Sequence, residues 1–227
     1  MKYILMDVEG TTSSISFVHD VLFPYSLTRI EFFIHENLNE PTVQRIVKEL
    51  KVFLPQDIAN DQLIDQVILL LKKWIHEDRK HPLLKELQGL IWKQGYETGE
   101  LKGHVYEDVP IAFKNWAAQG IKLGIYSSGS VLAQRMLFGN SLFGNLNPWI
   151  SDNFDTAAGP KKVPQSYREI SDTIKTPAKQ ICFLSDSAEE IHAAEEVGLR
   201  AIQILREGRQ STCALTTAHN FLEIVVE

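Results

Sequence analysis

Residues 3–12 read Tyr3-Ile4-Leu5-Met6-Asp7-Val8-Glu9-Gly10-Thr11-Thr12, so a short apolar run ends in two carboxylates and a glycine–threonine turn. The apolar run predicts a buried strand with Asp7 at its carboxyl end. Alternate side chains of an extended segment point to the same side, so Asp7 and Glu9 face one ligand if the strand extends through Glu9. One carboxylate can then attack a phosphorus atom while the other moves a proton. Taken alone, these residues fit an ordinary acidic turn equally well.

Short apolar runs alternate with helical patterns from residue 105 onward. Helices are predicted at 109–118 and 187–197, and strands at 121–126, 181–184 and 200–205. This alternation indicates βαβ units, and therefore an α/β fold with a doubly wound, mostly parallel sheet. Ser187 and Glu190 have the spacing of a capping box at a helix start, and Gly198 is a natural stop. Asp186 is thus predicted to lie at the carboxyl end of a strand.

Residues 15–102 show helical periodicity and almost no strand signals. Pro24, Pro41 and Pro82 stand where helices can begin. We predict an α-helical cap domain inserted after the first strand, with residues 1–14 and 103–227 forming the α/β core. The apolar stripes that indicate these helices are Leu63, Val67, Leu70, Leu71 and Trp74, and then Leu84, Leu87, Leu90 and Ile91.

Composition limits the kinds of partner. The chain has 227 residues, which is enough for a core with an inserted second domain, and a formal charge of -6 without a Lys/Arg stripe argues against nucleic acid. Asp7 interrupts the first apolar run and no stretch approaches the ~18 apolar residues of a membrane span, so we expect no signal peptide, no membrane and a soluble, cytoplasmic protein. Cys182 and Cys213 allow at most one disulfide, and Cys182 lies in an apolar run that favours a reduced, buried thiol.

Two further segments offer groups that can bind a phosphate. The apolar run ending at Tyr126 is followed by Ser127-Ser128-Gly129-Ser130, where hydroxyl and N–H groups at a helix start can hold an anion. In Gly159-Pro160-Lys161-Lys162, one lysine can place its ammonium against a phosphate, although the chemistry does not decide which lysine. Gly10 and the threonines after it add a tight turn and further donors. The alternatives are an ordinary loop with a helix cap and a solvated basic loop.

Asp186 supplies a third carboxylate. If it converges with Asp7, the two form a hard oxygen site for Mg²⁺, which commonly takes one or two carboxylates together with waters and phosphate oxygens. Zinc is not expected, because the seven histidines lack the spacing of zinc ligands and the two cysteines are not closely spaced in the sequence. The predicted partner is therefore a small-molecule phosphate ester.

These segments, in this order, resemble the four motifs of the haloacid dehalogenase superfamily of phosphotransferases. Residues 7–11 are similar to the first motif, Ser127 to the second, Lys161 or Lys162 to the third and Asp186 to the fourth. The resemblance implies a haloacid dehalogenase-like core, with the helical insertion in the place of the family's cap. The superfamily commonly has aspartate where this chain has Glu9.

Glu9 narrows the resemblance to one subfamily. The chain is similar to the enolase-phosphatases of methionine salvage, also called acireductone synthases. These enzymes enolise 2,3-diketo-5-methylthiopentyl-1-phosphate and then remove its phosphate with Mg²⁺, giving 1,2-dihydroxy-3-keto-5-methylthiopentene. The resemblance implies a monomer with one Mg²⁺ per chain. It rests on residues 7–12, 22–25, 87–92, 126–130, 137–139, 154–156 and 166–168.

The same resemblance implies roles for individual residues. Asp7 would be the nucleophile and a metal ligand, and Asp186 would complete the metal site. Glu9 would give its backbone carbonyl to the metal, with its side chain a candidate for proton transfer. Thr11, Ser127, Ser128 and Lys161 would bind the phosphate, and Lys161 would also assist catalysis. No residue stands out as the base for enolisation.

Two other functions are compatible with these residues. One is a plain phosphatase of another small ester, without the enolase step. The other is a receiver-type module that stores phosphate on an aspartate and is not an enzyme. A receiver normally carries its phosphorylated aspartate on a central strand deep in the chain and lacks an inserted helical cap, so we favour the enzyme.

Overall fold

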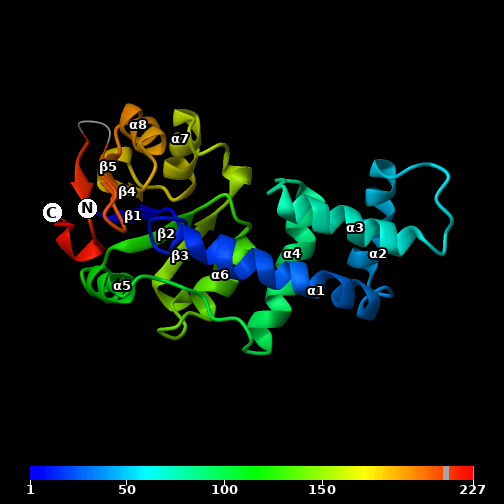
Figure 1. The fold of residues 1–227 in the computed structure, drawn as a ribbon. Coiled ribbons are helices and arrows are strands. Elements are labelled where there is room, and N and C mark those ends of the chain that lie inside the picture. Colours follow the sequence, from blue (N-terminus) through cyan, green and yellow to red (C-terminus); the bar gives the residue numbers. More distant parts are fainter. Residues whose placement is uncertain (212–214, 227) are drawn as a thin grey trace. The chain divides into compact units, whose positions relative to one another are not determined.

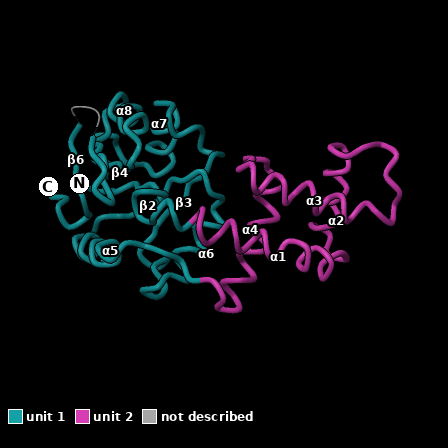
Figure 2. The backbone as a smooth tube through the Cα atoms, viewed as in Figure 1, with its two compact units in different colours: residues 1–17, 102–227 teal, residues 18–101 magenta. Residues whose placement is uncertain are grey.

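The chain folds into two compact units, which Figure 2 shows in different colours. The computed structural model describes residues 1–211 and 215–226. One unit contains residues 1–17 and 102–227, and the other contains residues 18–101. The boundaries predicted from the sequence differ from these by three residues at the first junction and by one at the second. Cys213 lies outside the described residues, and Cys182 is a buried free thiol.

The α/β unit is built on a parallel, six-stranded sheet with the order β3-β2-β1-β4-β5-β6. The central strand β1 pairs with β2 and β4, and Tyr3 lies opposite Lys122 and Ile181. Strands β1 and β4 are buried along their whole length, as expected for the middle of a parallel sheet. The predicted α/β fold with a doubly wound parallel sheet is confirmed. The strands are β1 (Tyr3–Met6), β2 (Lys122–Tyr126), β3 (Ile150–Phe154), β4 (Ile181–Ser185), β5 (Arg200–Ile204) and β6 (Thr217–Ala218).

Helices cover both faces of this sheet. Figure 1 shows α7 and α8 on one side of it and α5 on the other. Under α7 and α8 lies one apolar cluster, in which Tyr3 and Leu5 of β1 and Phe183 of β4 meet Tyr167 and Ile191 of the helices. The helices of this unit are α5 (Asp108–Ala118), α6 (Val131–Gly139), α7 (Pro164–Thr173) and α8 (Ala188–Glu196).

Helix α8 shows where the sequence prediction was right and where it was wrong. Ser187 is the N-cap residue, and Gly198, with a φ of +86°, follows the end of the helix as predicted. The predicted capping box does not form, because the side chain of Ser187 makes no cap hydrogen bond. The Glu190 carboxylate instead accepts a hydrogen bond from the Ser185 hydroxyl and forms an ion pair with Lys161. Glu190, which resembled a capping residue, therefore points toward the carboxyl ends of the sheet's strands.

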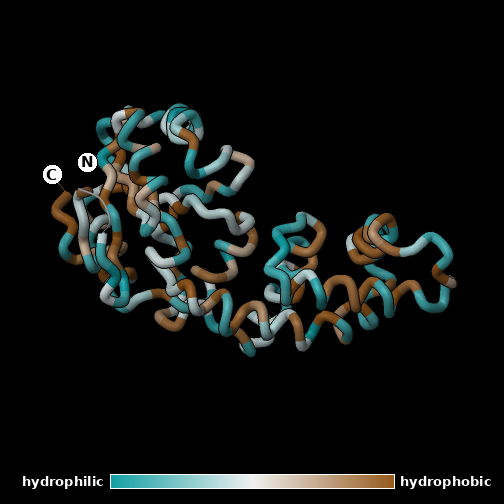
Figure 3. Tube along the Cα trace, turned by 45° about the horizontal axis from the view of Figure 1, so that its top comes forward, coloured by the Kyte–Doolittle hydropathy of each residue, from teal (hydrophilic) through white to brown (hydrophobic). Residues whose placement is uncertain are grey.

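The second unit, residues 18–101, is helical. Prolines begin or nearly begin three of its helices, as predicted. Its apolar core includes Leu71 and Trp74 of α3 and Leu87 and Ile91 of α4, so the predicted stripes face one another. Figure 3 shows hydrophobic and hydrophilic segments alternating along these helices. No helix of the described residues is both long and apolar enough to cross a membrane. The helices are α1 (Phe23–Glu36), α2 (Pro41–Leu50), α3 (Leu63–His76) and α4 (Pro82–Glu97), and a π-helical turn spans Phe17–Leu22.

Candidate active site

A tight turn follows β1 and carries the first two candidate residues. β1 ends at Met6, so the strand does not extend through Glu9 as the simple alternation argument requires. The strand stops because the Val8 carbonyl accepts hydrogen bonds from the N–H groups of Thr11, Thr12 and Ser13, at 3.2, 3.0 and 2.9 Å. Gly10 has a φ of +75°, a backbone conformation that glycine adopts without strain. The turn, and not a continued strand, sets the directions of Asp7 and Glu9.

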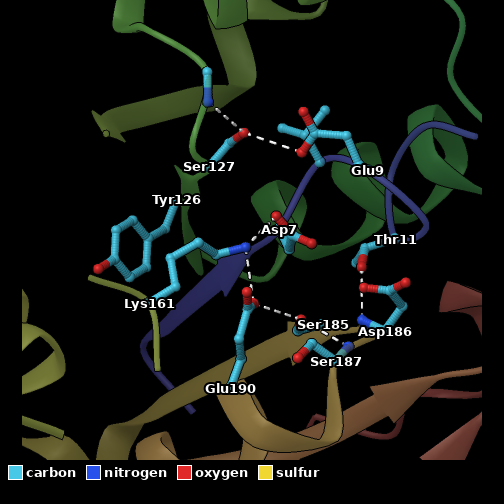
Figure 4. A network of polar contacts seen from close by, with 12 residues as sticks. Asp7, Glu9, Thr11, Tyr126, Ser127, Lys161, Ser185, Asp186, Ser187 and Glu190 are labelled. Carbon is cyan, nitrogen blue, oxygen red and sulfur yellow. Dashed lines mark hydrogen bonds and ion pairs between the residues drawn. The ribbon is translucent and has the colours of Figure 1, made fainter. Parts of the chain in front are cut away.

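Asp7 and Lys161 form a buried ion pair at the centre of the site (Figure 4). Asp7 is 3% exposed, and the Lys161 ammonium also lies 2.8 Å from the Glu190 carboxylate. Burial raises the pKa of Asp7 to about 8; the charge of Lys161 opposes the rise, and those of Glu9 and Glu190 add to it. Burial acts to lower the pKa of Lys161, but Asp7 and Glu190 together raise it above its usual value. Lys161 is therefore a firmly charged ammonium between two acids.

The structure separates the two neighbouring lysines. The Lys161 side chain is 11% exposed, whereas that of Lys162 is 63% exposed and pairs with Glu189 at the surface. The hydroxyl of Tyr167 donates to the Lys161 carbonyl at 2.6 Å, and that of Tyr126 donates to the Gly159 carbonyl at 2.9 Å. The sheet and α7 thus hold the loop so that only the first lysine enters the site.

Ser127 joins the second strand end to the turn after β1. It is 1% exposed, and its hydroxyl donates to Oε2 of Glu9 at 3.2 Å and accepts from the N–H of Gly129 at 3.1 Å. Ser128 is exposed on the same loop, and Ser130 caps α6 through the N–H of Ala133. Glu9 therefore reaches the loop that precedes α6, a helix whose N-terminal N–H groups favour an anion. Phosphate binding by Ser127 and Ser128 stays a prediction.

Asp186 lies at the carboxyl end of β4, as predicted, and faces the same turn. Its backbone N–H donates to the Thr11 hydroxyl at 3.0 Å. A side chain added at Gly10 would collide with the Asp186 carboxylate, so that carboxylate lies directly against the turn. Burial raises the pKa of Asp186, although Arg209, whose guanidinium is 2.9 Å from Oδ2, acts to lower it. Thr11 is fully buried, and its predicted contact with phosphate stays a prediction.

Sequence reasoning missed two charged groups of this site. Glu190 lies four residues after Asp186, on the first turn of α8, and that spacing alone was a usable signal because both residues follow one strand end. It was instead interpreted as a capping residue. Arg209, which pairs with Asp186, lies in a loop after β5 and carries no motif, so no local signal points to it.

Comparisons with known proteins show the family to which the chain belongs. A family model of haloacid dehalogenase-like hydrolases matches residues 1–198. The enolase-phosphatase E1 of Pseudomonas aeruginosa is 44% identical over 227 residues, covering 100% of this chain and 99% of that protein. The enolase-phosphatase E1 of Drosophila melanogaster is 47% identical over 216 residues, covering 91% of this chain and 84% of that protein. The chain belongs to the enolase-phosphatase family of haloacid dehalogenase-like hydrolases.

A solved structure shares the fold over nearly the whole chain. The UTR4 protein of Saccharomyces cerevisiae is 31% identical to this enolase-phosphatase family member, with a TM-score of 0.83. The match covers 98% of this chain and 99% of that one. The similarity therefore includes both units, and the motif resemblance stated from the sequence is confirmed.

The charges of the site fit a divalent cation. Hydrolases of this family generally use Mg²⁺. In the described residues, no three His, Cys, Asp or Glu side chains come together as a metal cluster. Mg²⁺ needs only one or two carboxylates, since it keeps waters and takes phosphate or carbonyl oxygens. The acids Asp7, Glu9, Asp186 and Glu190 outnumber their cationic partners, Lys161 and Arg209, by two. A cation of charge two would balance them.

Proposed function

We propose that this chain is the enolase-phosphatase that acts on 2,3-diketo-5-methylthiopentyl-1-phosphate in methionine salvage. One observation carries the phosphatase part: the buried Asp7 carboxylate is held by the Lys161 ammonium at the carboxyl edge of a parallel sheet. The enolase part is supported by the enolase-phosphatase relatives, which are 44–48% identical to this chain over the aligned residues. The product is 1,2-dihydroxy-3-keto-5-methylthiopentene plus phosphate.

Phosphate removal runs in two steps. The Asp7 carboxylate attacks phosphorus while the bond from phosphorus to the ester oxygen breaks, and the electron pair leaves with that oxygen. Glu9 gives a proton to the leaving oxygen, then takes one from a water molecule. This water attacks the phosphorus of the aspartyl-phosphate, which releases inorganic phosphate and restores Asp7. The Lys161 ammonium neutralises the phosphate oxygens throughout.

The same residues suit a metal ion and the enolisation step. Asp7, Asp186 and the backbone carbonyl of Glu9 would hold one Mg²⁺, which when bound supplies positive charge to the phosphate and the nucleophile. Enolisation removes a carbon-bound proton next to a carbonyl, and negative charge develops on that carbonyl's oxygen. We assign the stabilisation of this charge to Lys161, because its raised pKa keeps the ammonium charged. Ser127 and Ser128 would hold the phosphate.

Location and assembly belong to the same proposal. We place the enzyme in the cytoplasm as a monomer that meets only its small-molecule phosphate ester. The net charge of -6 supports the absence of a nucleic-acid partner. Light scattering of the purified chain would test the assembly, and a dimer mass would contradict it.

The deciding experiment separates the two reactions. The purified chain is incubated with the diketo phosphate and Mg²⁺, while enol absorbance and phosphate release are followed in parallel. We expect an enol signal that precedes phosphate release, and an Asp7→Asn variant that still enolises but releases no phosphate. Release from simple esters without any enol signal would contradict the assignment and indicate a plain phosphatase. Phosphate that persists on Asp7 for minutes without turnover would indicate a receiver-type module.

A further inference from the structure

Arg206 is a buried arginine just beyond the active-site edge of the sheet. It lies two residues after the end of β5 and is 5% exposed. Its Nη1 lies 2.9 Å from Oδ1 of Asp108, and both side chains are buried. The guanidinium carbon lies 4.2 Å from the centre of the Tyr106 ring and 5.0 Å from that of Phe221. Burying a charged pair costs desolvation energy, which its own attraction commonly fails to recover, so stability alone is a poor reason for such a pair.

A further contact of this guanidinium, a hydrogen bond, leads into the active site. Nε of Arg206 donates to the carbonyl oxygen of Thr11 at 3.0 Å. The hydroxyl of the same threonine accepts the backbone N–H of Asp186 at 3.0 Å. Thr11 therefore joins Arg206 on one side to Asp186 on the other. On its far side, the Asp186 carbonyl accepts from the Gln203 side chain at 2.9 Å.

This chain of contacts fixes two strand ends relative to each other. Thr11 belongs to the turn that carries Asp7 and Glu9, whereas Asp186 follows β4. The Thr11 carbonyl is bound by Arg206 and the Thr11 hydroxyl by the backbone N–H of Asp186. A shift of Arg206 would therefore move the turn and the Asp186 backbone together.

We propose that Arg206 is a positioning residue for the metal site of this enzyme: by holding Thr11 it holds the Asp186 carboxylate in register with Asp7. The inference rests on the proposed function, because it concerns the same site. Residues that orient metal ligands through hydrogen bonds typically change metal affinity or activity by about 10- to 100-fold when removed.

An arginine is required at this position by the geometry of its donors. Nε points to Thr11 while Nη1 points to Asp108, and the planar group between them lies against the Tyr106 ring. A lysine carries one compact ammonium and cannot reproduce a planar fork that serves acceptors in different directions, Thr11, Asp108 and the His219 carbonyl, and stacks on a ring. Arg206→Lys therefore keeps the charge and loses the positioning.

The first test removes the link at Thr11 with a matched pair of variants. Thr11→Val deletes the hydroxyl and keeps the shape, whereas Thr11→Ser keeps the hydroxyl. The Mg²⁺ dissociation constant is measured by isothermal titration calorimetry on metal-free protein without substrate. We expect Thr11→Val to bind Mg²⁺ about tenfold more weakly, and Thr11→Ser to stay within about twofold of the original protein.

The second test asks whether Arg206 acts through Thr11. Arg206→Met is combined with Asp108→Asn so that no buried carboxylate is left unpaired, and Asp108→Asn alone is the control. We expect the combined variant to weaken Mg²⁺ binding about tenfold and the control to change it less than about twofold. Adding Thr11→Val should cause little further loss, because both changes break one path. If the combined variant does not fold, Arg206→Lys takes its place, because the lysine leaves the Asp108 charge with a partner. We expect Arg206→Lys to weaken Mg²⁺ binding by the same factor.

Several outcomes would overturn the inference. The inference is wrong if Arg206→Lys, shown to be folded by circular dichroism, binds Mg²⁺ as tightly as the original protein. It is also wrong if the losses of Mg²⁺ affinity from Arg206→Met and Thr11→Val multiply to about 100-fold, because the two residues would then act independently. The proposed function fails differently: the original protein would bind Mg²⁺ with the expected pattern of variants and yet turn over no diketo phosphate. The two failures are therefore distinguishable.

Discussion

The two units of this chain differ in where they keep their charged side chains. In the α/β unit, Lys161 pairs with Asp7 and Glu190, and Arg206 pairs with Asp108, with no side chain of these pairs more than 11% exposed. In the helical unit, residues 18–101, every ion pair joins side chains that are at least 33% exposed. The α/β unit therefore has buried ion pairs beside exposed ones such as Lys162–Glu189, whereas the helical unit has exposed ones alone.

The difference reflects two kinds of requirement. Buried ion pairs contribute uncertainly to stability because both charges lose their hydration, so their presence in the α/β unit is better explained by chemistry that needs fixed charges. Water screens the exposed pairs of the helical unit, so these contribute little. That unit is held mainly by its apolar cluster around Leu71, Trp74 and Leu87. The comparison can be tested by changing buried charges in the α/β unit and apolar packing in the helical unit.

The largest effect is expected at the buried charges. Asp7→Asn and Asp186→Asn should each abolish phosphate release, a loss of about 10⁴-fold or more, because an amide is a poor nucleophile and a poor metal ligand. Folding should survive Asp7→Asn, since an amide has nearly the same shape as the carboxylate and Lys161 keeps the Glu190 carboxylate as a charged partner. Phosphate release and circular dichroism are measured on both variants. A variant that hydrolyses substrate at the original rate would contradict the metal–nucleophile model.

The second test disturbs the apolar cluster of the helical unit. Leu71→Ala removes a fully buried side chain and should lower the free energy of unfolding by about 2–5 kcal/mol. Leu69→Ala on the same helix is the matched control, because Leu69 is 58% exposed and its loss should change stability by about 0.5 kcal/mol or less. Urea unfolding followed by circular dichroism measures both. Equal effects of the two variants would mean that apolar packing does not hold this unit.

Much of this organisation could be predicted from the sequence because burial leaves a periodic trace. The apolar runs at β1, β4 and β5 and the stripes on α3 and α4 are direct consequences of which faces are buried. β3 escaped prediction because it lies at an edge and carries Asp152 and Asn153, which weaken any strand signal. Strands that need not be hydrophobic on both faces are the ones that sequence patterns miss.

The charged groups of the site were harder to predict than the fold. Asp7, Ser127 and Asp186 stand at strand ends, and position along a strand is readable from sequence. The choice between Lys161 and Lys162 depended on Tyr126 and Tyr167, which hold the loop from outside it. The contact of Arg206 with Thr11 joins residues 195 positions apart, and no local pattern encodes such a distance.

A third test extends the comparison to pH. His104 of the α/β unit is half-buried, and its Nδ1 accepts the N–H of Ser14 at 3.1 Å. Burial lowers the pKa of His104; the charge of Glu207 opposes this shift, and that of Arg206 adds to it. The folded state thus favours the neutral ring. Below a pH of about 6.5 the unfolded chain takes up a proton that the folded chain resists, so stability falls as the pH falls through this range.

His104→Asn should remove this pH dependence, because asparagine offers an uncharged acceptor for the same N–H. The free energy of unfolding is compared at pH 5.5 and pH 7.5 for both proteins. We expect a smaller difference between the two pH values in the variant than in the original chain, and a smaller overall effect than that of Leu71→Ala. An unchanged difference would show that other groups cause the pH dependence.

The smallest effect is expected at the surface charges of the helical unit. Arg29 lies 2.7 Å from Glu100, yet the two side chains are 47% and 44% exposed. A double-mutant cycle with Arg29→Ala and Glu100→Ala isolates the pair from the hydrogen bond that Tyr25 donates to the same carboxylate. We expect a coupling of about 0.2–1 kcal/mol, which 1 M salt should largely abolish. A coupling of about 3 kcal/mol or more that persists in salt would be the value of a buried pair. The helical unit would then depend on its ion pairs, and the contrast between the two units would not hold.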